Sequence, residues 1–238
     1  MTMRMRTIAS WAVLVSLAGA LSRAQDTQFL PEITQHFKLN STFRLVIQAK
    51  DDREGGDPQQ FTFGPSAEFH LKPLLKLKNV TLFDLDDAKR RPVVFESGYR
   101  IVTAPNAAAT NRAIEAVTFN FPFAFRTLLT DRNRADLDWQ AGQFTWRYRN
   151  KLTLQRTVGI SGYHLIPYVA AEPFYESKYQ KWSTTDLYIG SLFPVGKHVQ
   201  FDVYYEHENN TGKSPNRQNN FIGLALYLYF SREGATGE

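Results

Sequence analysis

The segment 197–230 constrains the fold most, because two long stretches of it alternate between apolar and polar residues. A β-strand places successive side chains on opposite faces, so this alternation predicts strands with one apolar and one polar face. In the first stretch the apolar face comprises Val199, Phe201, Val203, Tyr205 and His207, and the polar face comprises Gln200, Asp202, Tyr204, Glu206 and Glu208. In the second, Ile222, Leu224, Leu226, Leu228 and Phe230 share a face. Since a tilted membrane-spanning strand needs about 9 to 11 such residues, the segment predicts a hairpin of a transmembrane β-barrel.

The amino terminus has the organisation of a secretory signal peptide. Arg4 and Arg6 precede an almost unbroken apolar run over 8–21, and Ser22 and Ala24 are small residues at the positions that a signal peptidase reads. This run is too short for a membrane-spanning helix. We therefore expect a signal peptide over 1–24, a barrel domain over 25–230 and a polar tail over 231–238.

Charge and cysteine content narrow the location and the partners. The formal net charge of +5 falls to +2 once the leader arginines Arg4, Arg6 and Arg23 are removed, which does not favour a nucleic-acid partner. The chain has no cysteine, so an exported form has neither disulfides nor a lipid-modified amino terminus. No further apolar segment approaches the roughly 18 residues of a spanning helix, which excludes a helical inner-membrane protein. We expect a bacterial outer-membrane location, with outer-membrane lipid, lipopolysaccharide and the barrel-assembly machinery as partners.

The remaining mature chain alternates in the same way between turn-forming segments, and no stretch keeps a 3.6-residue periodicity for three turns. Ten predicted strands lie between Thr42 and Phe230, an even number that would return both ends to the periplasmic side. Segment 30–37 is also strand-like, and a count of twelve stays open if 74–85 supplies another strand. We predict an all-β, antiparallel up-and-down transmembrane barrel of about ten strands. Within it, Pro65 would require a bulge.

Four motifs carry a resemblance to a known family. They are Asp131-Arg132-Asn133-Arg134, Arg147-Tyr148-Arg149-Asn150-Lys151-Leu152, Pro167-Tyr168-Val169 and Glu172-Pro173-Phe174-Tyr175, together with Tyr204-Tyr205 and the ending over 223–230. With these motifs the chain resembles, over nearly its whole mature length, the bacterial family catalogued as domain of unknown function 2490. The resemblance implies an outer-membrane β-barrel without an assigned enzymatic activity, and it supplies no catalytic residues.

The carboxy-terminal strand also resembles the signal that barrel-assembly machinery reads. That signal is a glycine followed by alternating apolar or aromatic residues and a final phenylalanine, and Gly223, Leu226, Leu228 and Phe230 match it. The tail over 231–238 is a departure, because the signal usually stands at the chain end.

If the apolar faces meet lipid, the opposite faces line the lumen. The expected lumen residues are Arg44, Lys50, Glu68, Glu96, Arg100, Arg126, Arg147, Arg149, Lys151, Glu172, Asp202 and Glu206. In a narrow barrel these long side chains could pair with one another and form a structural plug. Alternatively they line a small channel whose basic stretch at Arg147, Arg149 and Lys151 favours anionic solutes. Both readings are non-enzymatic and need no cofactor.

Two alternatives remain open. A lipid hydrolase could use His207 as its base near the outer rim, with Thr185 beside it and Ser183 diagonal to it. No nucleophile motif surrounds Ser183, and no histidine or aspartate spacing indicates a metal site. A soluble periplasmic lipid-binding barrel would instead turn the apolar faces inward, which alternation alone cannot exclude.

Overall fold

The computed structural model describes residues 27–54, 57–71, 83–212 and 214–231, and within them nearly every element is a β-strand. The strands are β1 (Thr27–Lys38), β2 (Phe43–Glu54), β3 (Asp57–His70), β4 (Val93–Thr103), β5 (Thr110–Phe123), β6 (Thr127–Gln140), β7 (Gln143–Arg156), β8 (Val158–Ile160), β9 (Tyr163–Glu176), β10 (Lys181–Val195), β11 (Val199–Asn210) and β12 (Arg217–Ser231). A short 3-10 helix, η1 (Asp87–Arg90), lies between β3 and β4.

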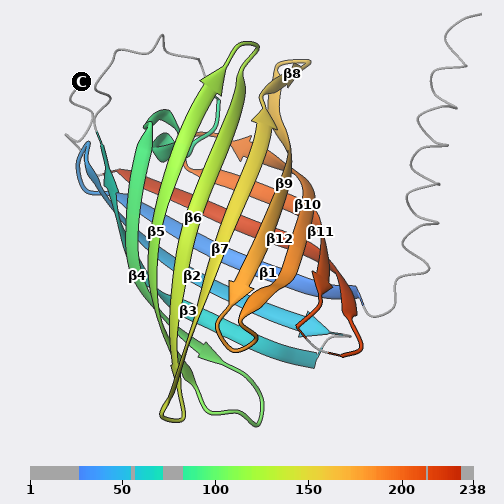
Figure 1. Ribbon diagram of the computed structural model, residues 1–238. Helices are drawn as coiled ribbons and strands as arrows, with labels where there is room; N and C mark the ends of the chain where they lie inside the picture. Colours follow the sequence, from blue (N-terminus) through green and yellow to red (C-terminus); the bar gives the residue numbers. More distant parts are fainter. Residues whose placement is uncertain (1–26, 55–56, 72–82, 213, 232–238) are drawn as a thin grey trace, which may run out of the picture.

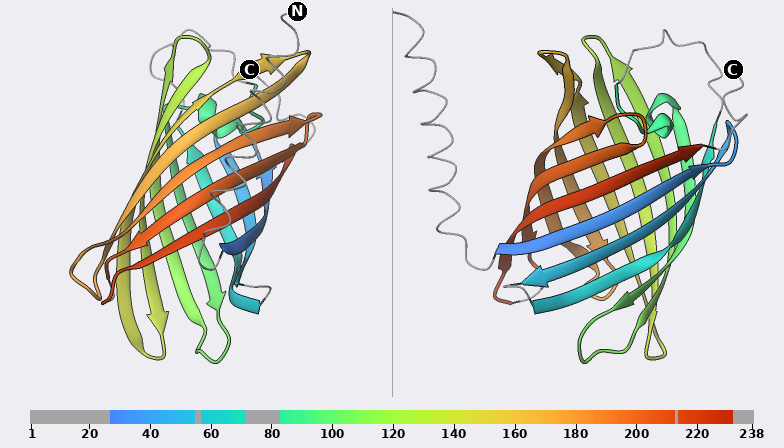
Figure 2. Two further views of the ribbon diagram at one scale, coloured as in Figure 1. Left: turned by 90° about the vertical axis from the view of Figure 1, so that its right-hand side faces the viewer. Right: turned by 180° about the vertical axis from the view of Figure 1, so that it is seen from behind.

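These strands close into a barrel (Figures 1 and 2). Sequential neighbours pair antiparallel, β7 pairs with β9, and β8 extends from β9 outside the ring. The ring closes where β1 pairs with β12 in parallel, for example Ile33 with Leu226. The all-β, mostly antiparallel barrel predicted from the alternation is therefore confirmed.

Within the described residues the ring contains eleven strands, one more than the preferred count of ten. The additional strand is β1, which contains the strand-like stretch 30–37. The expectation of an even count required both ends of the barrel to lie at the same rim. A ring with an odd number of strands closes instead through a parallel pair, here β1 with β12, and its two ends lie at opposite rims. Residues 74–82 of the proposed twelfth strand lie outside the described residues, as do the expected signal peptide and residues 232–238.

The apolar faces of the strands point outward. Phe61, Phe95 and Val203 are 44%, 46% and 46% exposed, whereas Arg100 and Asp136, on inner faces, are 2% and 0% exposed. A soluble lipid-binding barrel would need the opposite arrangement, with the apolar faces turned inward. Among the described residues no helix is long and apolar enough to cross a membrane, a finding that does not bear on crossing by strands.

A few polar side chains interrupt the apolar outer face of β4 to β6. Ser97 Oγ donates a hydrogen bond to Glu115 Oε1 over 2.7 Å, and Asn133 Nδ2 donates to Asp131 Oδ1 over 3.2 Å. The alternating residues Arg132 and Arg134 line the lumen instead. The motif 131–134 therefore sends its arginines inward and its other two side chains outward.

The expected bulge at Pro65 is not formed, because the β3–β4 register is the same before and after the point where their pairing is interrupted. The paired register runs through Phe63 and resumes at Ser66, so Pro65 lies where pairing with β4 is interrupted. Arg100 Nη1 donates a hydrogen bond to the Pro65 carbonyl over 2.7 Å, which satisfies a group that the sheet leaves unpaired. The backbones approach closely here, because a Cβ on Gly64 would lie 2.1 Å from the Tyr99 carbonyl oxygen.

Candidate solute site in the barrel lumen

The structure places eleven of the twelve expected lumen residues around two connected cavities inside the described barrel. The larger cavity is lined by Lys50, Arg147, Arg149, Lys151, Glu172, Asp202 and Glu206. The smaller is lined by Arg44, Glu68, Glu96 and Arg100. Both cavities share Glu32, Gln48, Arg132, Arg134 and Tyr227 in their linings, so they adjoin.

Arg126 is the exception, and its assignment to the lumen is wrong. The chain turns between Phe123 and Thr127, and Arg126 has a positive φ of 57° in that turn. Its side chain is exposed, and its guanidinium carbon lies 4.9 Å from the centre of the Phe83 ring. In the sequence Arg126 continues the alternation of the lumen-facing residues. Alternation between two faces applies only within a strand, however, and Arg126 lies in a turn.

The larger cavity has a volume of about 490 Å³ and a balanced lining. Eight acidic and eight basic side chains of the described residues line it. The basic ones are Lys50, Arg112, Arg132, Arg134, Arg147, Arg149, Lys151 and Lys178, and the acidic ones are Glu32, Asp52, Glu172, Glu176, Asp186, Asp202, Glu206 and Glu208. No net excess of positive charge therefore distinguishes the cavity as a whole.

The two charges are segregated around the ring. Strands β5, β6 and β7 supply the basic arc, which comprises Arg112, Arg132, Arg134, Arg147, Arg149 and Lys151. All eight acids lie on β9, β10, β11, β1 and β2. In the strand order the basic arc borders the acidic arc directly where β7 pairs with β9, and Glu32 on β1 lies across the ring from β6. Two basic side chains, Lys50 on β2 and Lys178 in the β9–β10 turn, lie on the acidic side.

Asp136 anchors the basic arc from below the cavity surface. It is fully buried, Arg134 Nε lies 2.6 Å from its Oδ1, and Arg147 Nη2 lies 2.8 Å from its Oδ2. A buried carboxylate is stable when it is paired and hydrogen-bonded, and Asp136 meets both conditions. Sequence reasoning missed Asp136, Arg132 and Arg134, although their alternation along 127–140 carried the signal.

Glu172 joins the two arcs. Its Oε1 lies 3.3 Å from Arg149 Nε, its Oε2 lies 3.6 Å from Lys151 Nζ, and Tyr188 donates a hydrogen bond to Oε2 over 3.1 Å. With the Asp136 pairs, these contacts form the mixed-charge lattice expected for the lumen.

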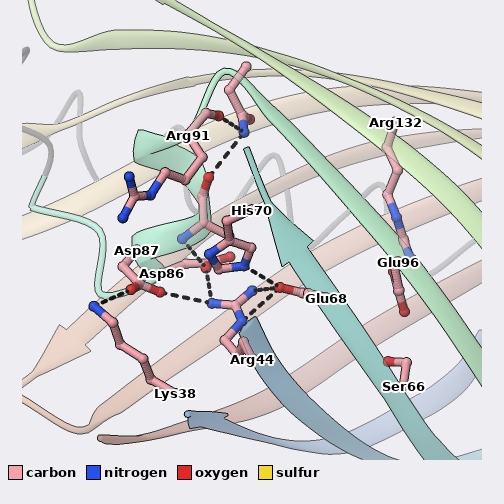
Figure 3. Close-up of polar contacts among 12 residues, drawn as sticks. Lys38, Arg44, Ser66, Glu68, His70, Asp86, Asp87, Arg91, Glu96 and Arg132 are labelled. Carbon is pink, nitrogen blue, oxygen red and sulfur yellow. Dashed lines mark hydrogen bonds and ion pairs between the residues drawn. The ribbon is translucent and has the colours of Figure 1, made fainter. Parts of the chain in front are cut away.

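At the other end, the smaller cavity of about 270 Å³ adjoins the connection between β3 and β4. Arg44 on β2 lines this cavity, and Figure 3 shows its guanidinium between Glu68 and Asp86. The Arg44 guanidinium contacts Glu68 Oε2 at 2.6 Å and Asp86 Oδ1 at 2.5 Å, and His70 Nε2 lies 3.1 Å from the same Glu68 oxygen. Arg44 therefore ties the wall of the barrel to the connection.

We call residues 84–91 of this connection the cap segment. Its Lys89 Nζ lies 2.6 Å from Asp84 Oδ2 and donates to Gln155 Oε1 on β7 over 3.0 Å, while Gln200 on β11 accepts the Leu85 amide over 3.2 Å. Further contacts join Asp87 to Lys38 on β1 at 2.8 Å and the Ala88 carbonyl to Asn120 on β5 at 3.2 Å. Because these strands lie on different sides of the ring, the cap segment spans the end of the lumen.

Two charged groups of the cap segment have shifted pKa values. Burial alone would raise the pKa of Asp86, but the Arg44 guanidinium together with His36 and Lys89 outweighs burial and holds that pKa well below its usual range. Burial alone would lower the pKa of Lys89, but the Asp84 and Asp86 carboxylates raise it above its usual value. Both groups are therefore charged in the neutral pH range.

The geometry proposed for a hydrolase is not formed. His207 pairs with Leu187 rather than Thr185, because the β10–β11 turn pairs Val195 with Val199 and shifts the register by two residues. Its Nδ1 lies 2.9 Å from Asn220 Oδ1. Ser183 is 1% exposed and donates a hydrogen bond to Glu176 Oε1 over 2.6 Å, far along the strand from His207.

Two further expectations concern metal binding and the assembly signal. In the described part of the chain, no group of three histidine, aspartate or glutamate side chains could hold a metal ion. The residues of the expected assembly signal all lie on β12, with Gly223 facing inward and Phe230 outward at 44% exposure. Their recognition by assembly machinery stays a prediction.

The fold and the lumen define a closed β-barrel with an apolar outer face and a charged interior. A family model, "Protein of unknown function (DUF2490)", matches residues 28–219. The chain belongs to this family, as the motifs at 131–134 and 147–152 indicated. A search of curated proteins finds no match.

Proposed function

We propose that this chain is an outer-membrane β-barrel that admits small charged solutes into its lumen and is closed at one end by the cap segment. The outward apolar side chains support the membrane location, because a face of this kind is stable against lipid. The signal peptide predicted at the amino terminus supports export. No catalytic step is part of the proposal.

The observation that carries the proposal is the larger cavity with its segregated charges. A purely structural barrel of this width could fill its interior with paired side chains, yet about 490 Å³ remains between the basic and acidic arcs. This volume falls in the range of small-molecule sites, roughly 300 to 1,000 Å³. Because the acidic and basic side chains are equal in number, we replace the expected anion preference with access for small charged solutes of either sign.

The orientation follows from β12. Terminal strands of outer-membrane barrels end on the periplasmic side, and the cap segment lies at the same rim as the end of β12 (Figure 2). The cap segment would then face the periplasm, and the larger cavity would open toward the cell exterior near the β9–β10 turn. Lys178 of that turn lines this cavity.

Thiol labelling tests access, because the chain has no cysteine of its own. We would refold the mature chain in lipid vesicles with a single Thr62→Cys substitution in the cavity lining or Val203→Cys on the outer face. Thr62→Cys should react with a small hydrophilic thiol reagent and resist a polymer-bearing maleimide. Val203→Cys should react with neither, because lipid covers it.

Each contrary outcome removes one part of the proposal. An unreactive Thr62→Cys in folded protein would favour the plugged structural barrel. Rapid reaction at Val203→Cys, equal to that of the exposed turn variant Lys197→Cys, would contradict the membrane location. Migration on a denaturing gel that changes on heating would establish that each variant had folded as a barrel.

A further inference from the structure

The larger cavity presents two opposite charges at once to anything that enters it. We propose that this cavity is a binding site for small zwitterions, with the acidic group of the ligand on the basic arc and its ammonium group on the acidic arc. The inference rests on the proposed function, since it requires that solutes reach the lumen. It goes beyond that function by naming the class of solute that the cavity retains.

The first support is the arrangement of the arcs. A simple anion is attracted by β5 to β7 and repelled by the eight carboxylates on the other strands, and a simple cation meets the reverse. A zwitterion gains from both arcs when it lies in the cavity between them, because it presents one charge to each arc. The cavity lining, with equal numbers of acidic and basic side chains, therefore favours ligands that carry both charges over ligands that carry only one.

The second support comes from the donors of the basic arc. Arg132 donates to Glu96 through Nη2 over 2.6 Å, and its side chain stays 31% exposed to the cavity. Arg147 contacts Asp136 through Nε and Nη2, and its side chain is 27% exposed. A guanidinium carries five N–H donors, so each arginine keeps donors for a ligand carboxylate or phosphate.

The third support comes from the acidic arc. Asp186 on β10 is 5% exposed, and its Oδ1 has no hydrogen-bond partner among the described residues. Its other oxygen accepts a hydrogen bond from Tyr188 over 3.2 Å. Leaving a buried carboxylate oxygen unpaired is unfavourable, and an ammonium group with three donors would satisfy it. Asp186 and Glu206 both line the larger cavity, on adjacent strands.

Three small probes of similar size distinguish the effect of one charge on binding from the effect of two opposite charges on the same molecule. Glycylglycine is a zwitterion, N-acetylglycine carries the carboxylate alone, and glycylglycinamide carries the ammonium alone. Titration calorimetry on the refolded mature chain should give glycylglycine an affinity at least roughly tenfold above either single-charge probe. Equal affinities for the three, or no binding of glycylglycine, would overturn the proposal.

Substitutions in the two arcs test which arc binds each end of the ligand. Asp186→Asn should weaken glycylglycine and glycylglycinamide roughly tenfold and leave N-acetylglycine unchanged, while Arg132→Gln should weaken glycylglycine and N-acetylglycine but not glycylglycinamide. Glu206→Gln serves as a second acidic variant if Asp186→Asn does not refold. Lys197→Gln, in an exposed turn at the other rim, is the matched control and should change nothing.

The experiments distinguish failure of the zwitterion site from failure of the proposed solute access. If Thr62→Cys reacts with small thiol reagents and glycylglycine still does not bind, the lumen admits solutes and the zwitterion site is wrong. If Thr62→Cys does not react, access itself fails and the site fails with it. An equal loss of all three probes in Asp186→Asn and Arg132→Gln would mean a general structural effect and would also overturn the assignment.

Discussion

Asp86 of the cap segment lies 2.5 Å from the Arg44 guanidinium on β2, and this ion pair joins the closed end of the lumen to the barrel wall. Arg44 is 3% exposed, so water screens the pair weakly. The same guanidinium also contacts Glu68 on β3. The closure is therefore part of a charged network that includes the wall, and each contact in it can be tested separately.

Removing the Asp86 charge should loosen the cap segment. Breaking a buried ion pair costs about 3 to 5 kcal/mol, so Asp86→Asn should speed hydrogen exchange at the amides of 84–91 by at least roughly tenfold. Lys38→Gln is the matched comparison, because the Lys38–Asp87 pair is 28% and 29% exposed and should contribute less than about 1 kcal/mol. Equal exchange in wild type and Asp86→Asn would show that the pair does not hold the segment.

The closure should resist moderate acid. The folded pKa of Asp86 lies below its unfolded value of about 3.9, so the ion pair contributes stability above that value and loses it as pH falls through the folded pKa. Protection of the cap segment from proteolysis should therefore be constant from about pH 8 to about pH 5 and decline only below about pH 4. A loss of protection between about pH 7 and pH 5 would contradict this assignment.

Gly223 is required beneath an aromatic ring. A Cβ at this position would lie 2.0 Å from Tyr204 Cζ, so Gly223→Ala forces the ring to move and should lower the free energy of unfolding by about 1 to 3 kcal/mol. Urea titration of the refolded protein measures this change. The loss should be smaller in a Tyr204→Ala background, and strictly additive effects of the two substitutions would mean that the ring is not the cause.

The turns at the two ends of β10 distinguish the two rims of the barrel. Lys178 in the β9–β10 turn and Lys197 in the β10–β11 turn lie at opposite rims. In intact cells an impermeant maleimide should label Lys178→Cys and spare Lys197→Cys. The reverse pattern would place the cap segment at the cell exterior, and labelling of both would contradict a single membrane-spanning orientation.

Alternation predicted much of the wall from sequence. It assigned Asp202 and Glu206 to the interior and Phe201 to the outside, because each strand has only two faces. It could not determine the strand count, since the pairing of β1 with β12 joins opposite ends of the chain and depends on how the ring closes. The register of His207 failed for a local reason, a turn displaced by one residue.

The cap segment had no sequence signal of its own. Its contacts join Asp84, Asp86 and Lys89 to side chains on β2 and β7, and no periodicity relates a connection to the strands that it meets. In the sequence Asp84 and Asp86 are two acidic residues for which no pattern indicates a partner. Their pairing with Arg44 and Lys89 depends on the closed barrel, so the candidate site could be predicted for its walls and not for its closed end.

Conductance in a planar bilayer tests the central claim most directly. Refolded wild-type protein should conduct weakly, and Asp86→Asn and Arg44→Gln should each raise the single-channel conductance, because either substitution releases the cap segment from β2. The double variant should conduct no more than the larger single effect, since both remove the same ion pair. Folded variants whose conductance does not exceed that of the wild type would contradict a solute-admitting lumen closed by this segment.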